Sequence, residues 1–163
     1  MDYASILITI VMMAIFIGPV IYLNTAQKAA DKKLLKVFLS LASQHHLNIT
    51  EADCWNGRYA IGLDPKSKKL FFIKKEKDNI TESVTDLSKI KSCSANRVTR
   101  TTPAKNSNRE ITTRLELVLI PTASQSDSSS STLIFYKEDE SSGLANELPL
   151  LKKWEQIVRD FVA

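Results

Sequence analysis

The stretch YAIGLDPKSKKLFFIKK (residues 59–75) has the most regular pattern in this chain of 163 residues. Two short apolar runs flank the polar segment DPKSKK, and Asp64-Pro65 is a turn signal because proline presets the backbone angle that a turn needs. Two such runs separated by a turn are typical of a pair of antiparallel strands. The stretch therefore predicts a β-hairpin with a basic turn.

The second apolar run of this hairpin has large side chains on both faces. Alternate residues of a strand point to opposite sides. Leu70 and Phe72 therefore share one face, and Phe71 and Ile73 share the other. We expect this strand to be covered on both sides, by a helix of this chain or by a partner.

The lysines of the hairpin indicate a candidate surface for a membrane or a partner. Lys66, Lys68 and Lys69 lie at the turn, and each lysine near an anionic leaflet contributes about 1 kcal/mol to binding. Lysines on a strand edge also discourage pairing with other strands, which favours a solvated hairpin over a specific lipid site. We predict a lipid or partner surface made of these lysines with Phe71 and Ile73, and we expect the apolar pair to matter more.

Residues 4–23 (ASILITIVMMAIFIGPVIYL) predict a membrane anchor. The segment has 20 residues without a charge, and as a helix it would be about 30 Å long, the thickness of the hydrocarbon core of a bilayer. A cleaved signal peptide is the alternative, but such peptides have a basic start and a shorter apolar core, whereas this chain begins with MDY. We assign residues 1–24 to an uncleaved transmembrane anchor.

The charges beside the anchor predict its orientation. The residues before it include Asp2 and no lysine or arginine, whereas Lys28, Lys32, Lys33 and Lys36 follow it. By the positive-inside rule, the large C-terminal part faces the cytoplasm. We therefore expect a single-pass membrane protein whose large C-terminal part lies in the cytoplasm.

Residues 25–48 predict an amphipathic stem helix. Apolar side chains recur there every three or four residues and form one stripe, which consists of Ala30, Leu34, Val37, Phe38, Leu41 and Ala42. We expect this stripe to pack on the following domain. His45 and His46 end the helix, and neighbouring helical residues point about 100° apart, so these two histidines do not form a metal pair.

Residues 49–163 predict a β-rich domain. Seven short runs have the alternation and the flanking turn residues typical of strands; they cover residues 49–55, 58–63, 69–74, 82–87, 89–96, 110–120 and 132–137. Asn56-Gly57 is a turn signal because both residue types tolerate positive φ. Residues 99–108 and 122–131 are expected to be loops, since they have few apolar side chains to bury.

Residues 148–162 predict a closing helix. Its apolar residues recur at helical spacing and form the core of this helix: Leu151, Trp154, Ile157, Val158 and Phe161. A buried tryptophan can cover roughly 200 Å² of surface. We therefore expect the helix to cap the sheet.

The segments RYAIGLDPKSKKLFFIKK, VTDLSKIKSCSANR, LELVLI, LIFYKE and LLKKWEQIVRDFV, in this order, resemble the pleckstrin-homology-like (PH-like) fold. More narrowly, the chain looks like a group of small uncharacterised bacterial membrane proteins with one N-terminal anchor and a PH-like domain. The resemblance covers residues 50–163 and implies an α+β fold, with about seven mainly antiparallel strands in a bent barrel or sandwich that the C-terminal helix caps. No ligand residues are carried over, because DPKSKK matches the phosphoinositide-binding loops of this fold only loosely.

The sequence contains no recognised motif of an enzyme or cofactor site. GxxxxGK[ST], GxGxxG, HExxH and GxSxG do not occur. Cys54 and Cys93 lack the spacing of a zinc site, and both histidines belong to the stem rather than to the strands that carry the cysteines. We predict no catalytic, metal or cofactor site, and we expect both cysteines to be reduced thiols.

Three functions fit these observations. The first is a membrane-anchored, non-enzymatic adaptor that binds a protein partner or anionic lipid headgroups at the cytoplasmic membrane face. The second is a pilin-like or secretion-assembly subunit with an extracytoplasmic β domain, although no Gly-Phe processing site precedes the apolar run. The third is an enzyme without a recognised motif. Nucleic-acid binding is not expected, because the net charge of +4 is modest and exposed aromatics do not accompany the basic residues.

Overall fold

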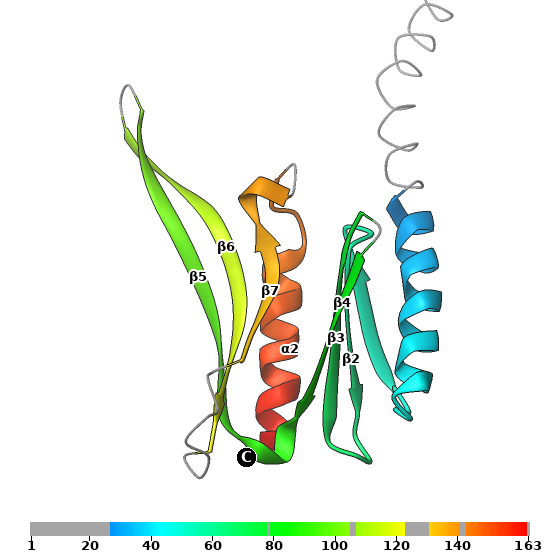
Figure 1. Ribbon diagram of the computed structural model, residues 1–163. Helices are drawn as coiled ribbons and strands as arrows, with labels where there is room; N and C mark the ends of the chain where they lie inside the picture. The colour runs from blue at the N-terminus through cyan, green and yellow to red at the C-terminus, as the bar shows by residue number, and fades with distance from the viewer. Residues whose placement is uncertain (1–26, 78, 105–106, 123–130, 141–142, 163) are drawn as a thin grey trace, which may run out of the picture.

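The computed structural model describes residues 27–77, 79–104, 107–122, 131–140 and 143–162, and it has an α+β fold (Figure 1). A first helix, residues 27–44, precedes seven antiparallel strands in two sheets and a C-terminal helix. The predicted anchor, residues 1–24, lies outside the described residues. Within the ranges just given, no helix has both the length and the apolar character needed to span a membrane.

The strands confirm the predicted order and number. Sheet A contains β1 (Glu51–Trp55), β2 (Tyr59–Asp64), β3 (Lys69–Glu76) and β4 (Asn79–Asp86), hydrogen-bonded in this order. The short 3-10 helix η1 (Leu87–Lys89) leads to sheet B, which contains β5 (Ile90–Ala104), β6 (Ser107–Pro121) and β7 (Ser131–Lys137). A second 3-10 helix, η2 (Glu138–Glu140), precedes α2 (Glu147–Val162). The hairpin of residues 59–75 forms as predicted, with Leu63 opposite Leu70.

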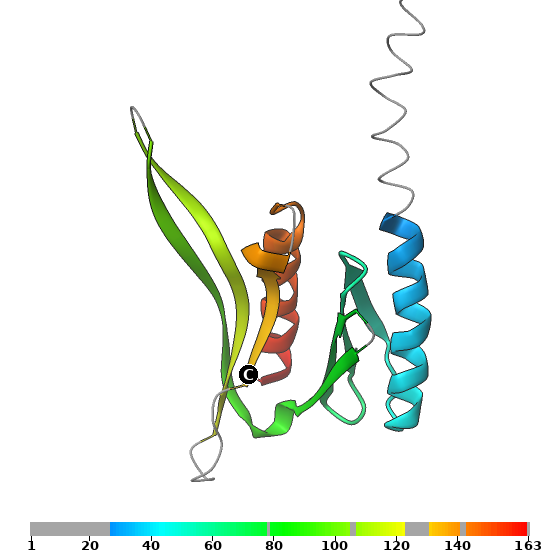
Figure 2. The same ribbon diagram turned by 45° about the horizontal axis from the view of Figure 1, so that its top comes forward.

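The two sheets do not close into a barrel. In the part of the chain that the structure describes, no strand of sheet A pairs with a strand of sheet B. The chain turns through η1 between β4 and β5 (Figures 1 and 2), so the two strands do not continue one ladder. Of the two expected forms, the closed barrel is therefore wrong, and two separate sheets are observed.

The first helix ends in a defined backbone motif. Leu47 N donates to Ala42 O at 2.9 Å, and His46 N donates to Ser43 O at 3.0 Å. His46 has a φ of 56°, the left-handed conformation usual just after a helix. Leu47 is buried beside Ala42, which is the apolar contact that accompanies this motif. The helix therefore ends at residue 44, four residues before the predicted end at residue 48, and the chain turns back toward β1.

The inner face of sheet A faces the main core of the protein. Alternation along β2 and β3 sends one set of side chains inward: Tyr59, Ile61, Leu63, Leu70 and Phe72. They share this core with apolar residues of sheet B and of α2. Trp154 is fully buried there, with Leu151 and Val158, while Ile157 and Phe161 pack at its margin. The predicted core of the closing helix is thus present in the structure.

The outer face of sheet A packs against the first helix. Leu34, Phe38 and Ala42 are buried against this face, and the Phe38 ring stacks on Phe71 with centroids 5.0 Å apart. Gly62 allows this approach, because a Cβ atom there would lie 2.8 Å from a ring atom of Phe38. β3 is therefore covered on both faces, as its two-sided apolar pattern predicts.

Sheet B extends into a two-stranded ribbon. β5 and β6 pair as far as Ala104 and Ser107, whereas β7 pairs with β6 only between Leu119 and Arg114. The expected loop over residues 99–108 is therefore wrong for its described residues, because threonine-rich strands form a ladder here without a core. The backbone hydrogen bonds of the ladder and the β-branched side chains stabilise the ribbon.

The elements run alternately between two ends of the molecule (Figures 1 and 2). Gln27, at the start of the first helix, donates from Nε2 to Asn56 Oδ1 at 3.1 Å, in the turn between β1 and β2. η2 and the ribbon tip lie toward this same end (Figure 1). The turn between β2 and β3, residues 65–68, lies at the opposite end because β2 separates the two turns.

Candidate interaction surfaces

The lysine turn of the predicted surface is held by one carboxylate. Asp64 is buried, and it accepts backbone hydrogen bonds from Asn48, Lys66 and Ser67 at 3.0, 3.0 and 3.3 Å. These bonds, that from Asn48 above all, hold the pKa of Asp64 below its usual range. The backbone of the turn is therefore fixed. Lys66 and Lys68 are exposed and Lys69 is half-buried.

Phe71 and Ile73 do not contribute to this surface. Both side chains are 0% exposed, because the first helix covers the outer face of β3. His45 adds to the cover, with its ring 5.5 Å from that of Phe71. The prediction of an apolar interface at these two residues is therefore corrected: the segment is an intramolecular interface, and only the lysines remain available.

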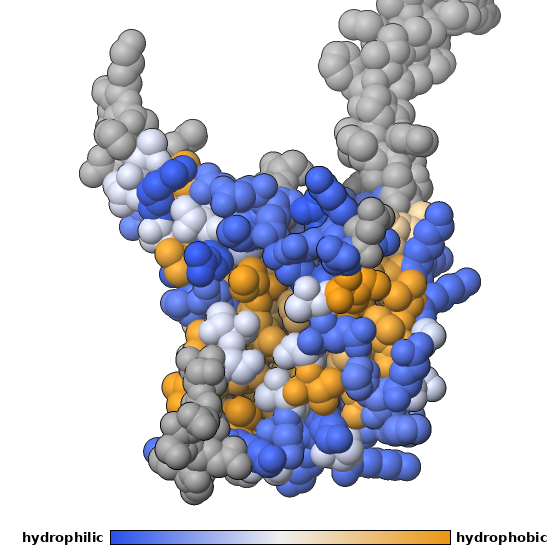
Figure 3. Space-filling view, in the orientation of Figure 1, coloured by the Kyte–Doolittle hydropathy of each residue, from blue (hydrophilic) through white to orange (hydrophobic). Residues whose placement is uncertain are grey.

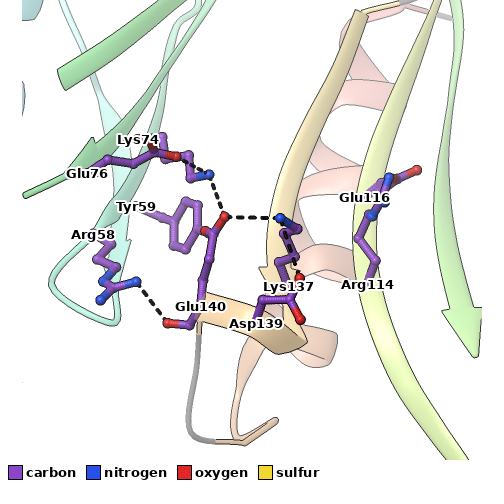
Figure 4. Close-up of polar contacts among 9 residues, drawn as sticks. All are labelled: Arg58, Tyr59, Lys74, Glu76, Arg114, Glu116, Lys137, Asp139 and Glu140. Atoms are coloured by element: carbon purple, nitrogen blue, oxygen red, sulfur yellow. Dashed lines mark hydrogen bonds and ion pairs between the residues drawn. The ribbon is translucent and has the colours of Figure 1, made fainter. Parts of the chain in front are cut away.

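A polar cluster joins sheet A to η2 at the opposite end of the molecule (Figure 4). Tyr59 Oη donates to Glu140 Oε2 at 2.6 Å, and Lys74 Nζ donates to Glu140 Oε1 at 2.9 Å. Arg58 Nη1 also donates to the Glu140 carbonyl at 2.8 Å, and Lys137 Nζ lies 3.7 Å from Oε1. The Glu140 carboxylate therefore accepts hydrogen bonds from sheet A and forms an ion pair with Lys137 of sheet B.

The titration of this cluster reflects its contacts. Burial opposes ionisation of Glu140, but hydrogen bonds from Tyr59 and Lys74 hold its pKa below the usual range. Burial and the neighbouring carboxylate raise the pKa of Tyr59. The neutral phenol of Tyr59, the ionised carboxylate of Glu140 and the charged Lys74 form a polar contact between the sheets, which we call the Glu140 clasp. A shallow depression of about 490 Å³ beside it is lined by Arg58, Glu76, Lys77, Asn79 and Glu140.

A groove of about 380 Å³ lies where the first helix, the β1–β2 turn and the start of α2 meet. Asp31 Oδ1 accepts from Gly57 N at 2.7 Å on one side. On the other side, Glu147 accepts from Asn56 Nδ2 at 2.8 Å and from Ala145 N at 2.6 Å. The polar groups that line the groove thus bond to one another and fix the three elements together.

The cysteines and histidines lack the arrangement of a catalytic site. Burial, with the nearby carboxylates Asp31 and Asp53, raises the pKa of Cys54 to about 12, and such a thiol is a poor nucleophile at neutral pH. Cys93 is buried in the main core, and burial raises its pKa as well. His45 Nε2 instead lies 2.7 Å from Glu82 Oε2.

Metal binding has no support in the described ranges. Outside the gaps at 1–26, 78, 105–106, 123–130, 141–142 and 163, no three His, Cys, Asp or Glu side chains are arranged to hold an ion. On the face shown in Figure 3, hydrophilic residues gather toward the two ends and apolar residues lie between them. This face therefore exposes an apolar middle between two hydrophilic ends.

Sequence reasoning missed the Glu140 clasp and the groove. Tyr59 and Glu140 are 81 positions apart, and no local pattern links residues at that separation. The acidic run of Glu138, Asp139 and Glu140 was a possible signal, because a compact acidic segment attracts lysines of a neighbouring sheet. In comparisons with known proteins, no family model, no curated protein and no solved structure matches the chain.

Proposed function

We propose that the chain is a membrane-anchored adaptor, a single-pass bacterial protein whose β domain binds a protein partner at the cytoplasmic face of the inner membrane. The docking of the first helix carries this proposal. Leu34, Phe38 and Ala42 are buried against sheet A, so the segment that follows the proposed anchor belongs to the folded domain. An anchor joined through this helix would present the domain in one orientation, which suits recognition of a partner.

The order of the strands supports a PH-like assignment for residues 49–163. Four antiparallel strands, three further antiparallel strands and one helix follow one another along the chain. Trp154 lies at the centre of that helix and is fully buried. The fold carries no activity with it, so the adaptor role rests on the surfaces and not on the likeness.

The position of the lysine turn favours a protein partner over anionic lipid. Gln27 contacts the β1–β2 turn, which lies at the opposite end of β2 from the lysine turn. The described part of the first helix has 18 residues and a length of about 27 Å. This length is roughly three times the distance over which physiological salt screens charges, about 8 Å. Lysines at the far end would therefore contribute little to binding at a membrane that begins before residue 27.

Two measurements test the proposal. A reporter fused after Ala163 should be active only in the cytoplasm; activity outside it would overturn the proposed orientation. The full chain in liposomes should crosslink a protein partner equally well after Lys66, Lys68 and Lys69 are changed to glutamate. If these three changes abolish association of the soluble part with anionic liposomes and also the function in cells, lipid binding would replace partner binding in the proposal.

A pilin-like subunit is the second candidate, because a long N-terminal helix packed on an antiparallel sheet is also found in pilins. That role requires the β domain outside the cytoplasm. Cys54 and Cys93 are free and lie in different cores, which suits a reducing compartment better. The same reporter separates the two candidates, since only the pilin-like subunit gives a signal outside.

A further inference from the structure

The outer strands of the two sheets are β1, β4, β5 and β7, and the ribbon also leaves one side of β6 unpaired in the described residues. Helix α2 contacts two of these strands. β1 lies beside α2, where Asp53 accepts from Lys153 Nζ at 2.7 Å and from Trp154 Nε1 at 2.9 Å. At the lower part of β5, Ala95 N points away from β6 and donates to Glu155 Oε1 of α2 at 3.1 Å. Helix α2 therefore contacts both of these edge strands.

Irregular backbone and positive charge protect the remaining parts of sheet B. β7 has a register shift at Phe135, whose carbonyl accepts from Trp55 Nε1 at 2.8 Å. In the ribbon the register shifts between Val98 and Thr99, where Thr113 of β6 is the extra residue, and β5 carries Arg97 and Arg100. Bulges and basic side chains are the usual means by which proteins prevent an edge strand from pairing further.

The edge of β4 has none of these protections. Its sequence, NITESVTD, contains no proline, lysine or arginine, and it pairs with β3 over eight residues without a register shift. In the part of the chain that the structure describes, no strand pairs with its outer side and no backbone hydrogen bond reaches it from another element. β4 is therefore a regular strand with an open edge.

The backbone groups that β4 offers follow from its register. Leu87 N donates to Lys68 O at 2.8 Å, so this pair is a bonded pair of the ladder. Bonded and non-bonded pairs alternate in an antiparallel ladder. The residues that direct their N–H and C=O groups to the open side are therefore Ile80, Glu82, Val84 and Asp86.

The side chains of these four residues indicate what the edge would bind. Apolar Ile80 and Val84 alternate with acidic Glu82 and Asp86 on the outer face, and Val84 is 41% exposed. Glu82 and Asp86 are the only charged residues of β4. Glu82 Oε2 lies 2.7 Å from His45 Nε2, and Asp86 Oδ1 accepts from Ser88 N at 3.0 Å, so a basic side chain at the edge would share these carboxylates with contacts of the chain itself. A strand placed along this edge is stabilised by a basic side chain opposite each acid and an apolar one opposite Val84.

A second copy of the chain fits this edge poorly. Two β4 strands can pair antiparallel about a two-fold axis only in registers that place outward-facing residues opposite one another. Centring on Glu82 puts that acid opposite itself, and centring on Val84 puts Glu82 opposite Asp86. Centring the two-fold axis midway between Glu82 and Val84 puts each acid opposite an apolar residue. Like charges directly opposite one another destabilise a pair of strands, so a partner with basic residues fits better.

We propose that the open edge of β4 binds an extended segment of a partner protein by strand addition, with lysine or arginine alternating with apolar residues. Main-chain hydrogen bonds give such complexes their affinity, and the alternate side chains give specificity. The proposal rests on the adaptor function and names the surface and the chemistry of the partner.

The test uses the full chain in lipid nanodiscs and two synthetic peptides, Thr-Lys-Thr-Val-Thr-Lys-Thr-Val and its counterpart with glutamate for lysine. Amide hydrogen exchange at Ile80, Glu82, Val84 and Asp86 should slow when the basic peptide is added, and should not change with the acidic one. The intervening residues of β4 already bond to β3, so their exchange should stay the same.

A matched pair of variants adds a control. Val84→Lys places a positive charge on the β4 edge, and Val98→Lys places one on the ribbon at nearly the same exposure, 41% against 40%. We expect Val84→Lys to weaken binding of the basic peptide about tenfold, since like charges cost about 1.4 kcal/mol or more at such contacts. Val98→Lys should leave it unchanged.

Four outcomes would overturn the inference. Equal weakening by both variants would exclude the β4 edge as the site. Equal protection by both peptides would exclude the role of charge. Protection that appears without peptide as the protein concentration rises would assign the edge to a second copy. A chain with Val84→Lys that still crosslinks its partner in liposomes would refute this inference alone, whereas a reporter active outside the cytoplasm would refute the adaptor proposal alone.

Discussion

Sheet A and sheet B have the same antiparallel ladder, but only sheet A is covered on both faces. The first helix packs on its outer face, and the main core lies under its inner face. Sheet B has α2 on one side (Figure 1), and Ile120 and Val98 on the other side remain 44% and 40% exposed. β3 has apolar residues at consecutive positions, whereas β5 mixes serine, asparagine and threonine with its apolar residues. The difference shows that the residue composition of a strand already indicates whether the strand is buried on both faces.

The largest expected effect comes from removing the cover of sheet A. Phe38→Ala deletes a fully buried ring that stacks on Phe71, and we expect a loss of about 3–5 kcal/mol in the free energy of unfolding. Ile120→Ala on the open face of sheet B should change it by no more than about 0.5 kcal/mol. Urea denaturation of both variants measures the difference. Similar losses of unfolding free energy in the two variants would mean that the two outer faces contribute equally to stability.

Gly62 tests how closely the helix must approach sheet A. Gly62→Ala would place a Cβ atom 2.8 Å from both Phe38 and Ile49, so one of the packed groups must move. Overpacking of this kind costs about 1–3 kcal/mol. Thermal unfolding should show a lower midpoint, and a variant as stable as the parent would mean that the helix shifts away from β2 at no cost.

The helix end offers a stabilising change. His46 adopts a φ of 56°, and a non-glycine residue in the left-handed region costs about 1–2 kcal/mol. We expect His46→Gly to raise the free energy of unfolding by about 1 kcal/mol. His45→Gly, at a residue without positive φ and with a contact to Glu82, should instead lower it. Paired urea titrations of the two variants distinguish local strain from a general effect of glycine.

The smallest effect is a pH dependence at the lysine turn. Backbone hydrogen bonds, first that from Asn48, lower the pKa of Asp64 in the folded protein. Its contribution to stability is therefore present above the unfolded pKa of about 4 and is lost as the pH falls through the lower folded value. Asp64→Asn should reduce the denaturation midpoint at pH 7, and the difference from the parent should shrink toward pH 2. A constant difference at all pH values would exclude this carboxylate as its source.

Local periodicity was sufficient to predict the elements that bury a continuous face. The stripe with Leu34 and Phe38, the two-sided run of β3 and the apolar face around Trp154 all repeat at the spacing of their element. The same pattern could not say which cover lies on Phe71 and Ile73, because a helix of the chain and a partner produce the same signal.

Elements held by backbone pairing or by distant contacts were not predictable in this way. Residues 99–102 of β5 are exposed in the ribbon, and this segment has the composition of a loop. Glu140 contacts Tyr59 and Lys74 across 81 and 66 positions of the sequence. Whether the edge of β4 is open likewise depends on the order of the strands in the sheet. The sequence of a single strand does not specify that order.

The docking of the first helix also has a mechanical consequence. The helix runs along the strands of sheet A (Figure 1), with its start at one end of the sheet and its last turn at the other. Tension applied at residue 27 along this axis would load all the buried contacts from Leu34 to Ala42 in shear at the same time. Contacts loaded together resist pulling better than contacts that open one after another. The β domain would therefore bear a pull through its first helix better than a pull that peels β4 from β3.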